Sequence, residues 1–395
     1  MSTQVTLFGI PVAFLFFGAT LVGVALFARR SLEIAAAGFV AILVARLAGG
    51  GFDWVAHLQG QWSKLTNLFG LLVGFALVAD HFEQSHLPER LPRLLPRGAL
   101  GCFVLLALIW LMSGVLDNIA AALVGVVAAS RLFSRLHPGY VAGIVAAANG
   151  GGAGSVIGDT TTTMMWLEGI RPTTVLPAYL GAFVALLVVG IVAARQQARW
   201  APLAPPAVDP VPVDPARVAV VSASIAGLAC TNVVASAVFG RHAEALPALA
   251  IVVWLVLLVG GRLRPFAWGV AGRAARAALF LVVLVLSASL LPVDSLPRPT
   301  VFTTVLLGFV SAVLDNIPLT KLALVQGGYD WAFLAYSVGF GGSMIWFGSS
   351  AGVAVSEAVP DVRSVAVWVR HGWHIPLAFL AGHAAMILLR GWHPA

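Results

Sequence analysis

The chain has 395 residues, of which 60% are hydrophobic and only 10% are charged. A water-soluble domain of this composition would expose large apolar surfaces to water, so the composition excludes a soluble protein and indicates one that lies in a lipid bilayer. The net charge of +7 would suggest nucleic-acid binding in a soluble chain. Here we attribute it to basic residues gathered on the cytoplasmic side of a membrane protein, and we expect no nucleic-acid partner.

Apolar runs recur along the whole chain, from 7–27 to 375–389. Many have the length of a transmembrane helix, roughly 20 residues, and they lack the short alternating pattern of a β-barrel. Arg29 and Arg30 follow the first run in place of a small-residue cleavage site, so we expect this run to remain as a helix of the mature protein. The sequence therefore predicts an all-α polytopic protein of the bacterial inner membrane.

Two stretches of the sequence repeat. The segment 113–119 reads SGVLDNI, and 311–317 reads SAVLDNI. A glycine-rich segment follows each of them, over 149–160 and 339–350, so the order of parts is the same in both halves. We predict two repeats, 1–200 and 217–395, joined by a proline-rich cytoplasmic linker at 201–216.

Each repeat is expected to contain one re-entrant hairpin and one broken transmembrane helix. The hairpins are predicted at 98–135 and 300–326, with an Asp-Asn pair at each tip. The broken helices are predicted at 140–167 and 331–356, across the glycine-rich segments.

The basic residues that flank the hairpins predict their orientation. Three arginines between positions 90 and 97 precede the first hairpin, and Arg131 and Arg135 follow it. Arg298 alone precedes the second hairpin, and 326–330, which follows, has no Lys or Arg. Because loops rich in Lys and Arg lie in the cytoplasm, the first hairpin should enter from the cytoplasm and the second from the opposite face. The two repeats are thus predicted to have inverted topology.

Three acidic residues, Asp117, Asp159 and Asp315, lie within apolar sequence. A carboxylate at the centre of a membrane helix costs about 2.5–3.5 kcal/mol on the insertion scale, so such residues usually have a function. The simpler interpretation is that they cap half-helices, since Asn316 is followed closely by Pro318 as at many helix starts. A hairpin tip needs a cap in any case, and the repeated acid indicates cation binding in addition.

The glycine-rich segments are expected to form the second half of the site. Glycine disfavours a helix by about 1 kcal/mol per residue, so the helices should open at Gly150–Gly154 and at Gly339–Gly342. An opened helix would expose the backbone carbonyls of Asn149, Gly150 and Gly151, as transporters do when they coordinate ions. The alternative is that small residues allow close helix packing.

Hydroxyl residues accompany these segments. Thr160 and Thr161 open a run of four threonines directly after Asp159, and the second glycine-rich segment contains Ser343, Ser349 and Ser350. Hydroxyl and carboxylate oxygens suit Na⁺ or a polar substrate.

The stretch Gly348–Gly352 also matches the G-x-S-x-G pattern of serine hydrolases. An intramembrane serine protease with Ser350 as nucleophile and His374 or His383 as base is therefore a distant alternative. It leaves the duplicated Asp-Asn pair unexplained, and no strand is predicted before the serine. We expect the chain not to be an enzyme.

These motifs resemble those of the NhaD-type sodium/proton antiporters of the ion transporter superfamily, which also contains citrate and arsenite carriers. The resemblance covers most of residues 66–390. It implies a scaffold of outer helices, a transport domain that holds both hairpins and broken helices, elevator-like alternating access, and a homodimer. The chain departs from the family at Ala120 and Ala121, where the family has a hydroxyl residue, and at Lys321.

We hypothesise that Na⁺ or Li⁺ exchanges for H⁺ at shared carboxylates, with no cofactor. The metal ligands are predicted to be Asp117, Asn118, Asp315 and Asn316, supported by the hydroxyls and carbonyls above. The alternative is a Na⁺- or H⁺-coupled carrier of citrate, another carboxylate or arsenite, in which Lys321 would contact the substrate. In the antiporter, Lys321 would modulate the site or be a snorkelling residue at a helix end.

Overall fold

The computed structural model of the protein describes residues 6–7, 10–27, 30–87, 95–114, 116–156, 158–201, 212–239, 247–291, 298–314 and 316–394. The described part of the chain is nearly all helical. Its only regular strands are two short antiparallel ones near the N-terminus, β1 (Thr6–Leu7) and β2 (Ile10–Pro11), in which Leu7 pairs with Ile10.

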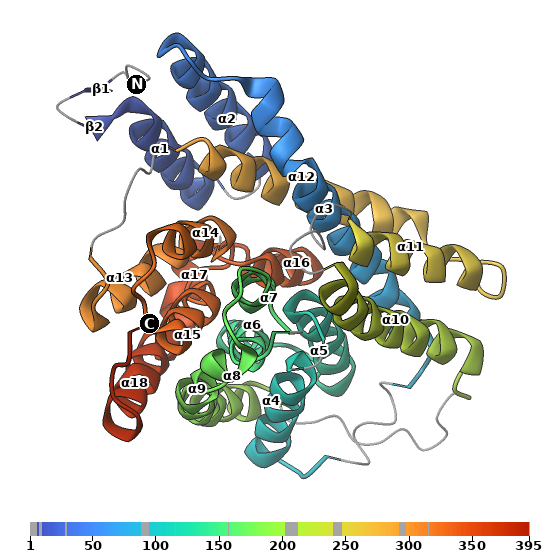
Figure 1. The fold of residues 1–395 in the computed structure, drawn as a ribbon. Coiled ribbons are helices and arrows are strands. Elements are labelled where there is room, and N and C mark those ends of the chain that lie inside the picture. The colour runs from blue at the N-terminus through green and yellow to red at the C-terminus, as the bar shows by residue number, and fades with distance from the viewer. Residues whose placement is uncertain are drawn as a thin grey trace.

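One group of helices combines the start of the chain with its middle. The helices α1 and α2 pack on each other, α12 packs on α2 and α3, and α10 and α11 pack on α3 (Figure 1). Their bounds are α1 Val12–Leu26, α2 Ser31–Ala48, α3 Trp54–Gln84, α10 Pro215–Phe239, α11 Ala248–Gly260 and α12 Trp268–Ser289.

A second group contains both Asp-Asn segments and both glycine-rich segments. Within it α9 packs on α4, α6 and α18, while α15 packs on α6, α9, α13 and α18. The helices of this group are α4 Ala99–Ser113, α5 Asn118–Leu132, α6 Pro138–Gly152, α7 Thr160–Leu167, α8 Pro172–Val175, α9 Ala178–Trp200, α13 Val301–Ser311, α14 Asn316–Gln326, α15 Trp331–Gly341, α16 Ser350–Ala358, α17 Val365–His371 and α18 His374–Leu389. The 3₁₀ turn Pro360–Val362 joins α16 to α17.

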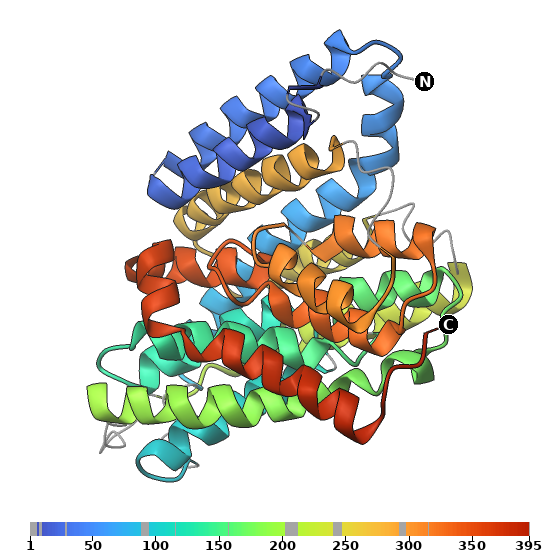
Figure 2. The same cartoon turned by 90° about the vertical axis from the view of Figure 1, so that its left-hand side faces the viewer.

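The two groups meet along a limited set of helices. In Figures 1 and 2, α1 and α2 lie on the far side of the molecule from α9 and α18. The contact between the groups runs mainly through α3 against α5 and through α12 against α16. The helices α5 and α16 therefore sit at the boundary between the groups.

Several helices are suited to span a bilayer. Among the described residues, four helical segments are long and apolar enough: α2, α3, α12 and the continuous stretch Pro172–Trp200 that contains α8 and α9. The pair α17 and α18, bent by 57°, makes a fifth if it is taken as one span. These features agree with a polytopic α-helical membrane protein.

The helices α6 and α15 form the centre of the second group. Every residue of α6 from Gly139 to Gly152 and every residue of α15 is buried. Neither helix carries a polar stripe, and a helix that is apolar all round is expected to be enclosed by other helices. The glycine-rich segments at their C-terminal ends are therefore held inside the protein.

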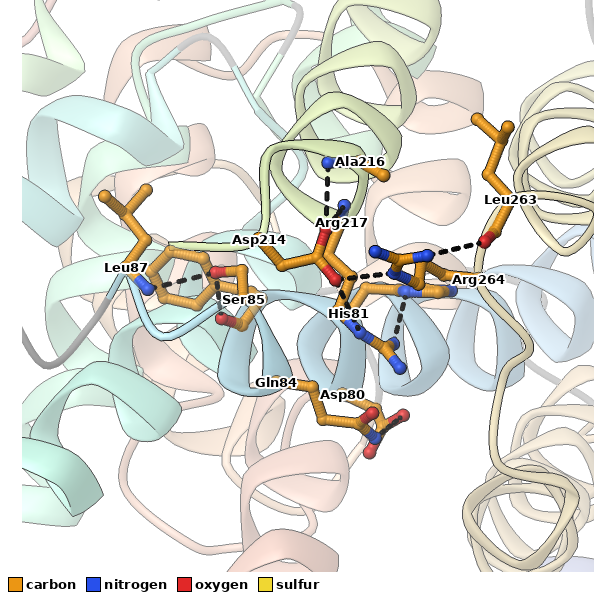
Figure 3. Close-up of polar contacts among 11 residues, drawn as sticks. Asp80, His81, Gln84, Ser85, Leu87, Asp214, Ala216, Arg217, Leu263 and Arg264 are labelled. Atoms are coloured by element: carbon orange, nitrogen blue, oxygen red, sulfur yellow. Dashed lines mark hydrogen bonds and ion pairs between the residues drawn. The ribbon is translucent and has the colours of Figure 1, made fainter. Parts of the chain in front are cut away.

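The described end of the proline-rich linker is fixed to helix ends of the first group, as Figure 3 shows. Asp214 accepts a hydrogen bond from Nε of Arg264 at 2.6 Å, and its backbone N–H donates to the Ser85 carbonyl at 3.0 Å. Arg217 donates to Nδ1 of His81 at 2.9 Å, so that nitrogen is the acceptor of the imidazole, because arginine has only donors. The hydrogen bond from Arg264 holds the pKa of the Asp214 carboxyl below its usual range.

Arginine side chains gather at this same end of the molecule. Arg131 on α5 pairs with Glu83 on α3 at 2.7 Å, and Arg276 on α12 pairs with Glu33 on α2 at 2.5 Å. Arg363, just after α16, donates to Ser31 at the start of α2 at 2.7 Å. We call the surface formed by these three arginines with Arg217 and Arg264 the arginine-rich face.

Candidate functional site

Asp117 is the N-cap residue of the helix α5. Its backbone is extended, and its Oδ1 accepts a hydrogen bond from the backbone N–H of Ile119 at 2.8 Å. The capping role predicted from the sequence is therefore correct for Asp117. The next residue, Asn118, is the first residue of α5 and is buried.

Asn149 connects three segments that are far apart in the sequence. It lies near the end of α6 with 1% of its surface exposed. Its Oδ1 accepts from Nδ2 of Asn118 at 3.2 Å, and its own Nδ2 donates to Oγ of Ser343 at 3.0 Å and to Oγ of Ser349 at 3.1 Å. One amide thus joins the first Asp-Asn segment to both glycine-rich segments.

Ser349 is held in place by a second contact. Its Oγ accepts from the backbone N–H of Gly352 at 3.2 Å, so the residue caps α16. The predicted site residues Asn118, Asn149, Ser343 and Ser349 therefore form one connected hydrogen-bond network.

Asp159 occupies the N-cap position of α7, directly before Thr160, and is buried. Its Oδ2 lies beside α15, 3.4 Å from the point where a Cβ at Gly339 would lie. Asp159 is thus buried beside α15, whereas Asp117, directly before Asn118, is half-buried at the start of α5.

The contacts between the glycine-rich segments are reciprocal. Asn149 contacts Ser343 and Ser349, whereas a Cβ at Gly339 would lie 3.5 Å from Ala153 Cβ and 3.4 Å from Oδ2 of Asp159. Asn149 therefore lies near the residues four and ten positions after Gly339, which are Ser343 and Ser349. Gly339 likewise lies near the residues four and ten positions after Asn149, which are Ala153 and Asp159. The two segments differ in chemistry, because the second has Gly339 and Ser349 at the positions that match Asn149 and Asp159.

The contacts between each Asp-Asn segment and its glycine-rich segment are also matched. Oγ of Ser113 donates to the Ala148 carbonyl at 2.6 Å, and Oγ of Ser311 donates to the Val338 carbonyl at 2.7 Å. Ser113 ends α4 and Ser311 ends α13, so the same bond recurs in both halves of the chain.

Glycine allows a close approach of backbones beside these bonds. A Cβ on Gly151 would lie 2.0 Å from the Trp110 carbonyl oxygen, and one on Gly341 would lie 2.2 Å from the Gly308 carbonyl oxygen. At both positions the glycine removes a steric clash between helices. The glycine-rich segments were expected either to open the helices or to allow close helix packing. The short distances at Gly151 and Gly341 show close packing at these two positions.

The predicted helix opening begins later than Gly150. The helix α6 continues to Gly152 and α7 starts at Thr160. The carbonyl of Gly150 accepts from the Ala153 N–H at 3.3 Å, and that of Gly151 accepts from the Tyr179 hydroxyl at 3.1 Å. These carbonyls already have donors because the close packing of α6 offsets the low helix propensity of glycine.

The threonines after Asp159 divide into two kinds. Thr162 and Thr163 each donate to the Asp159 carbonyl at 2.9 Å, so their hydroxyls fix the turn before α7. Thr161 is fully buried, and its hydroxyl has no hydrogen-bond partner among the described residues. Among Thr161, Thr162 and Thr163, whose side chains the structure describes, Thr161 is therefore the one with a hydroxyl to offer a ligand.

Of the second Asp-Asn pair, the structure describes Asn316 but not Asp315. Asn316 is the first residue of α14 and is buried, and its carbonyl accepts from the hydroxyl of Thr320 at 2.9 Å. Asp315 and the side chains of Thr160 and Lys321 lie outside the described residues.

Ser350 and the two histidines do not form a catalytic pair. His383 bonds to Oγ of Ser337 at 2.7 Å and to the Phe379 carbonyl. The two ring nitrogens of His374 make no hydrogen bond in the described structure. Ser350 starts α16 after a turn, so the strand that a nucleophile elbow needs is missing from this position.

Tyr179 and the role of Ser113 were not predicted from the sequence. Tyr179 donates to Gly151, and its ring packs against Trp110 with centroids 5.3 Å apart. Ser113 and Ser311 occupy the same position in the repeated motif. This recurrence is the feature of the sequence that could have predicted their shared role.

The apolar helices and the buried polar centre define a multi-pass membrane protein. No family model matches the chain. Its sequence is similar to sodium/proton antiporter 1 of Arabidopsis thaliana, with 28% identity over 316 residues, covering 71% of this chain and 52% of that protein. It is also similar to sodium/proton antiporter 2 of the same plant, with 28% identity over 279 residues, covering 61% of this chain and 66% of that protein.

The similar region spans about half of the first relative and less than two thirds of the second. Both relatives are named antiporters, which points to a membrane transporter and not to an enzyme.

Proposed function

We propose that the protein is a secondary transporter that exchanges Na⁺ or Li⁺ for H⁺ across the bacterial inner membrane. The similarity to two sodium/proton antiporters supports this function. The single observation that carries it is the Asn149 network, which joins Asn118, the residue directly after Asp117, to Ser343 and Ser349.

The cation would be held by oxygen atoms from both halves of the chain. Asp117 and Asp159 supply carboxylates, Asn118 supplies its Oδ1, and Thr161 supplies a hydroxyl. Hard oxygen ligands of this kind suit Na⁺ and Li⁺. Further ligands are proposed from the motifs in the sequence: the hydroxyls of Ser343, Ser349, Ser350 and Thr160, and the side chains of Asp315 and Asn316.

Exchange follows from competition for the carboxylates. Two nearby carboxylates favour binding of either a metal ion or a proton, since each relieves their repulsion. The empty, doubly charged site is expensive to move through a low-dielectric environment. The loaded forms therefore cross and the empty form does not, which couples the two ion flows.

We further propose that the halves are inverted repeats with re-entrant hairpins, and that the second helix group moves as a transport domain against the first. The reciprocal contacts of Asn149 and Gly339 support a two-fold relation between the repeats. The division of helices into two groups supports an elevator-like movement. The homodimer rests on the resemblance alone and is tested by mass measurement of the purified protein in detergent.

A carrier for citrate or another carboxylate is the second candidate. The half-helices α5, α7 and α16 begin in the region of the Asn149 network. Helix N-termini carry partial positive charge and attract anions, which favours an anionic substrate. In that case Lys321 would contact the substrate.

Transport by purified protein in proteoliposomes separates the candidates. A pH-sensitive dye reports proton movement when Na⁺, Li⁺, K⁺ or citrate is added. We expect responses to Na⁺ and Li⁺ that Asp117→Asn abolishes and that Asp361→Asn, an exposed acid outside the site, leaves unchanged. A response to citrate alone would reverse the ranking of the two candidates.

A further inference from the structure

A cavity of about 360 Å³ lies between the two helix groups. Its walls come from α3 and α12 of the first group and from α5 and α16 of the second group. Most of the lining is apolar, and four ionisable side chains complete it: Asp80, Glu83, Arg273 and Glu357. The cavity is thus bounded by the surfaces that move past each other in the proposed transport cycle.

Along α3, α5 and α16 the residues that line the cavity change from apolar to polar or charged. On α3 the apolar Leu72 and Ala76 precede Asp80 and Glu83, and on α5 Leu123 precedes Ser130. On α16 Ala354 precedes Glu357. The bond between Glu83 and Arg131 brings the ends of α3 and α5 together, so the polar ends of these helices lie at one end of the cavity.

On α12 Arg273 precedes Ala274 and Ala277, so its charge lies at the same end as the other charges. Val270 on α12 and Ala358 on α16 add apolar side chains to this charged end. One end of the cavity is therefore charged and the other end is apolar. The charged end lies at the arginine-rich face, next to Arg131 and Arg363, which bind Glu83 and Glu357.

The apolar end points along the helices toward the candidate site. Leu123 lies five residues after Asn118 on α5, and Ala354 lies four residues after Ser350 on α16. At a rise of 1.5 Å per residue, these distances along the helix axes are about 6–8 Å. The two helices that begin at the Asn149 network thus form one side of the cavity.

The charged residues of the cavity have different partners. Glu83 pairs with Arg131 at 2.7 Å, and Glu357 pairs with Arg363 at 2.9 Å. Asp80 accepts a hydrogen bond from the neutral amide of Gln84 at 2.7 Å, as Figure 3 shows. Among the described residues Asp80 forms no ion pair, and Arg273 is the one cation that shares the lining of the cavity with it.

We infer that this cavity is an aqueous vestibule through which cations reach the Asn149 network from the arginine-rich face, with Asp80 attracting them at its mouth. Ionisable side chains inside a membrane protein commonly line water-filled paths. A carboxylate in a narrow cavity with apolar walls concentrates cations, because the low-dielectric walls focus its field. The positive-inside rule assigns this face to the cytoplasm. The inference rests on the proposed function and names its entry route.

Thiol labelling tests the vestibule without any transport measurement. Cysteines are introduced at Ala76 and Ala277, one at a time, after Cys102 and Cys230 have been replaced by alanine and serine. Inside-out vesicles are then treated with a small, charged, membrane-impermeant methanethiosulfonate. We expect both cysteines to react, because a thiol must contact water to form the reactive thiolate.

Two control positions define the background of the labelling. Ala146 is 1% exposed within α6, and Leu108 is 47% exposed on the apolar helix α4. We expect cysteine at either position to remain unlabelled, since one is enclosed by protein and the other faces lipid. Equal labelling of the cavity and control positions in folded protein would overturn the vestibule, whatever ion the protein transports.

The role of Asp80 is tested by Asp80→Asn in the proteoliposome assay. We expect the apparent KM for Na⁺ to rise about three- to tenfold at low ionic strength, with the maximal rate unchanged. Added choline chloride should reduce the difference, because the Debye length is only about 10 Å at 0.1 M salt. Asp361→Asn is the matched control and should keep the original KM. An unchanged KM for Asp80→Asn at low ionic strength would contradict the role of this residue.

Discussion

Nδ2 of Asn149 donates a hydrogen bond of 3.1 Å to Oγ of Ser349, a residue 200 positions further along the chain. Ser349 caps α16, and Asn149 also binds Asn118 at the start of α5. The starts of two half-helices from different halves of the chain are thus linked through one buried amide.

The first prediction concerns the Asn149 amide. Asn149→Ala removes three hydrogen bonds and leaves the buried amide of Asn118 with one partner fewer. We expect a loss of unfolding free energy of about 2–4 kcal/mol, given roughly 1 kcal/mol per bond and the cost of an unsatisfied polar group. Na⁺-dependent proton movement should be lost, as measured in proteoliposomes.

Asn67→Ala is the matched control for this variant. Asn67 on α3 accepts a hydrogen bond from the Ala250 N–H at 2.9 Å, away from the Asn149 network. We expect this control to lower the melting temperature while proton movement continues. If Asn149→Ala transported Na⁺ as well as the control does, the network would not form the site.

The second prediction concerns close helix packing. Gly151→Ala would place a methyl carbon 2.0 Å from the Trp110 carbonyl oxygen, a backbone atom that cannot move away alone. We expect this variant to be unfolded or strongly destabilised when its melting is followed in detergent. Gly60→Ala on α3 has nothing within 4 Å of the new methyl and should be neutral or stabilising by about 0.5–1 kcal/mol. Wild-type stability of Gly151→Ala would show that α4 and α6 are not packed this closely.

The third prediction compares the two halves. Ser113→Ala and Ser311→Ala each remove a hydroxyl that donates to a buried carbonyl. We expect each to cost about 1 kcal/mol, and the two costs to be similar, because the two bonds have matched geometry. Thermal unfolding of the single variants provides the measurement. A large cost for one and none for the other would argue against equivalent packing in the two halves.

The fourth prediction concerns the pH dependence of stability at Asp214. Its pKa lies below the usual value for aspartate, about 3.9. The charged form is therefore favoured in the folded state, and its stabilisation is present at neutral pH and lost as the pH falls through the lowered pKa. We expect Asp214→Asn to melt at a lower temperature than the wild-type protein at pH 7. This difference should shrink below about pH 4, and a difference that stayed constant to pH 2 would exclude this contribution of Asp214.

The sequence predicted local features of the site well. Asp117 was predicted to cap a helix, and it caps α5. Its capping role follows from residue type and neighbours alone. Asn118, Asn149, Ser343 and Ser349 were predicted as site residues; the structure brings their side chains together in one network, and ion binding by them stays a prediction.

Other features depend on how helices face each other. The glycine-rich segment was expected to open at Gly150, but α6 continues to Gly152 because its packing against α4 outweighs the propensity of single residues. The bond from Tyr179 to Gly151 depends on the rotation of α9 about its axis, which a local motif does not determine. The same holds for the cavity, whose walls come from four helices.

Equilibrium binding of radioactive Na⁺ to the purified protein tests the central claim most directly. The wild-type protein should bind Na⁺ at alkaline pH, and its affinity should fall by about tenfold per pH unit once protons occupy a shared carboxylate. Asp117→Asn should bind little Na⁺ at any pH. Na⁺ binding by Asp117→Asn with the affinity and pH dependence of the wild-type protein would contradict competition at this carboxylate.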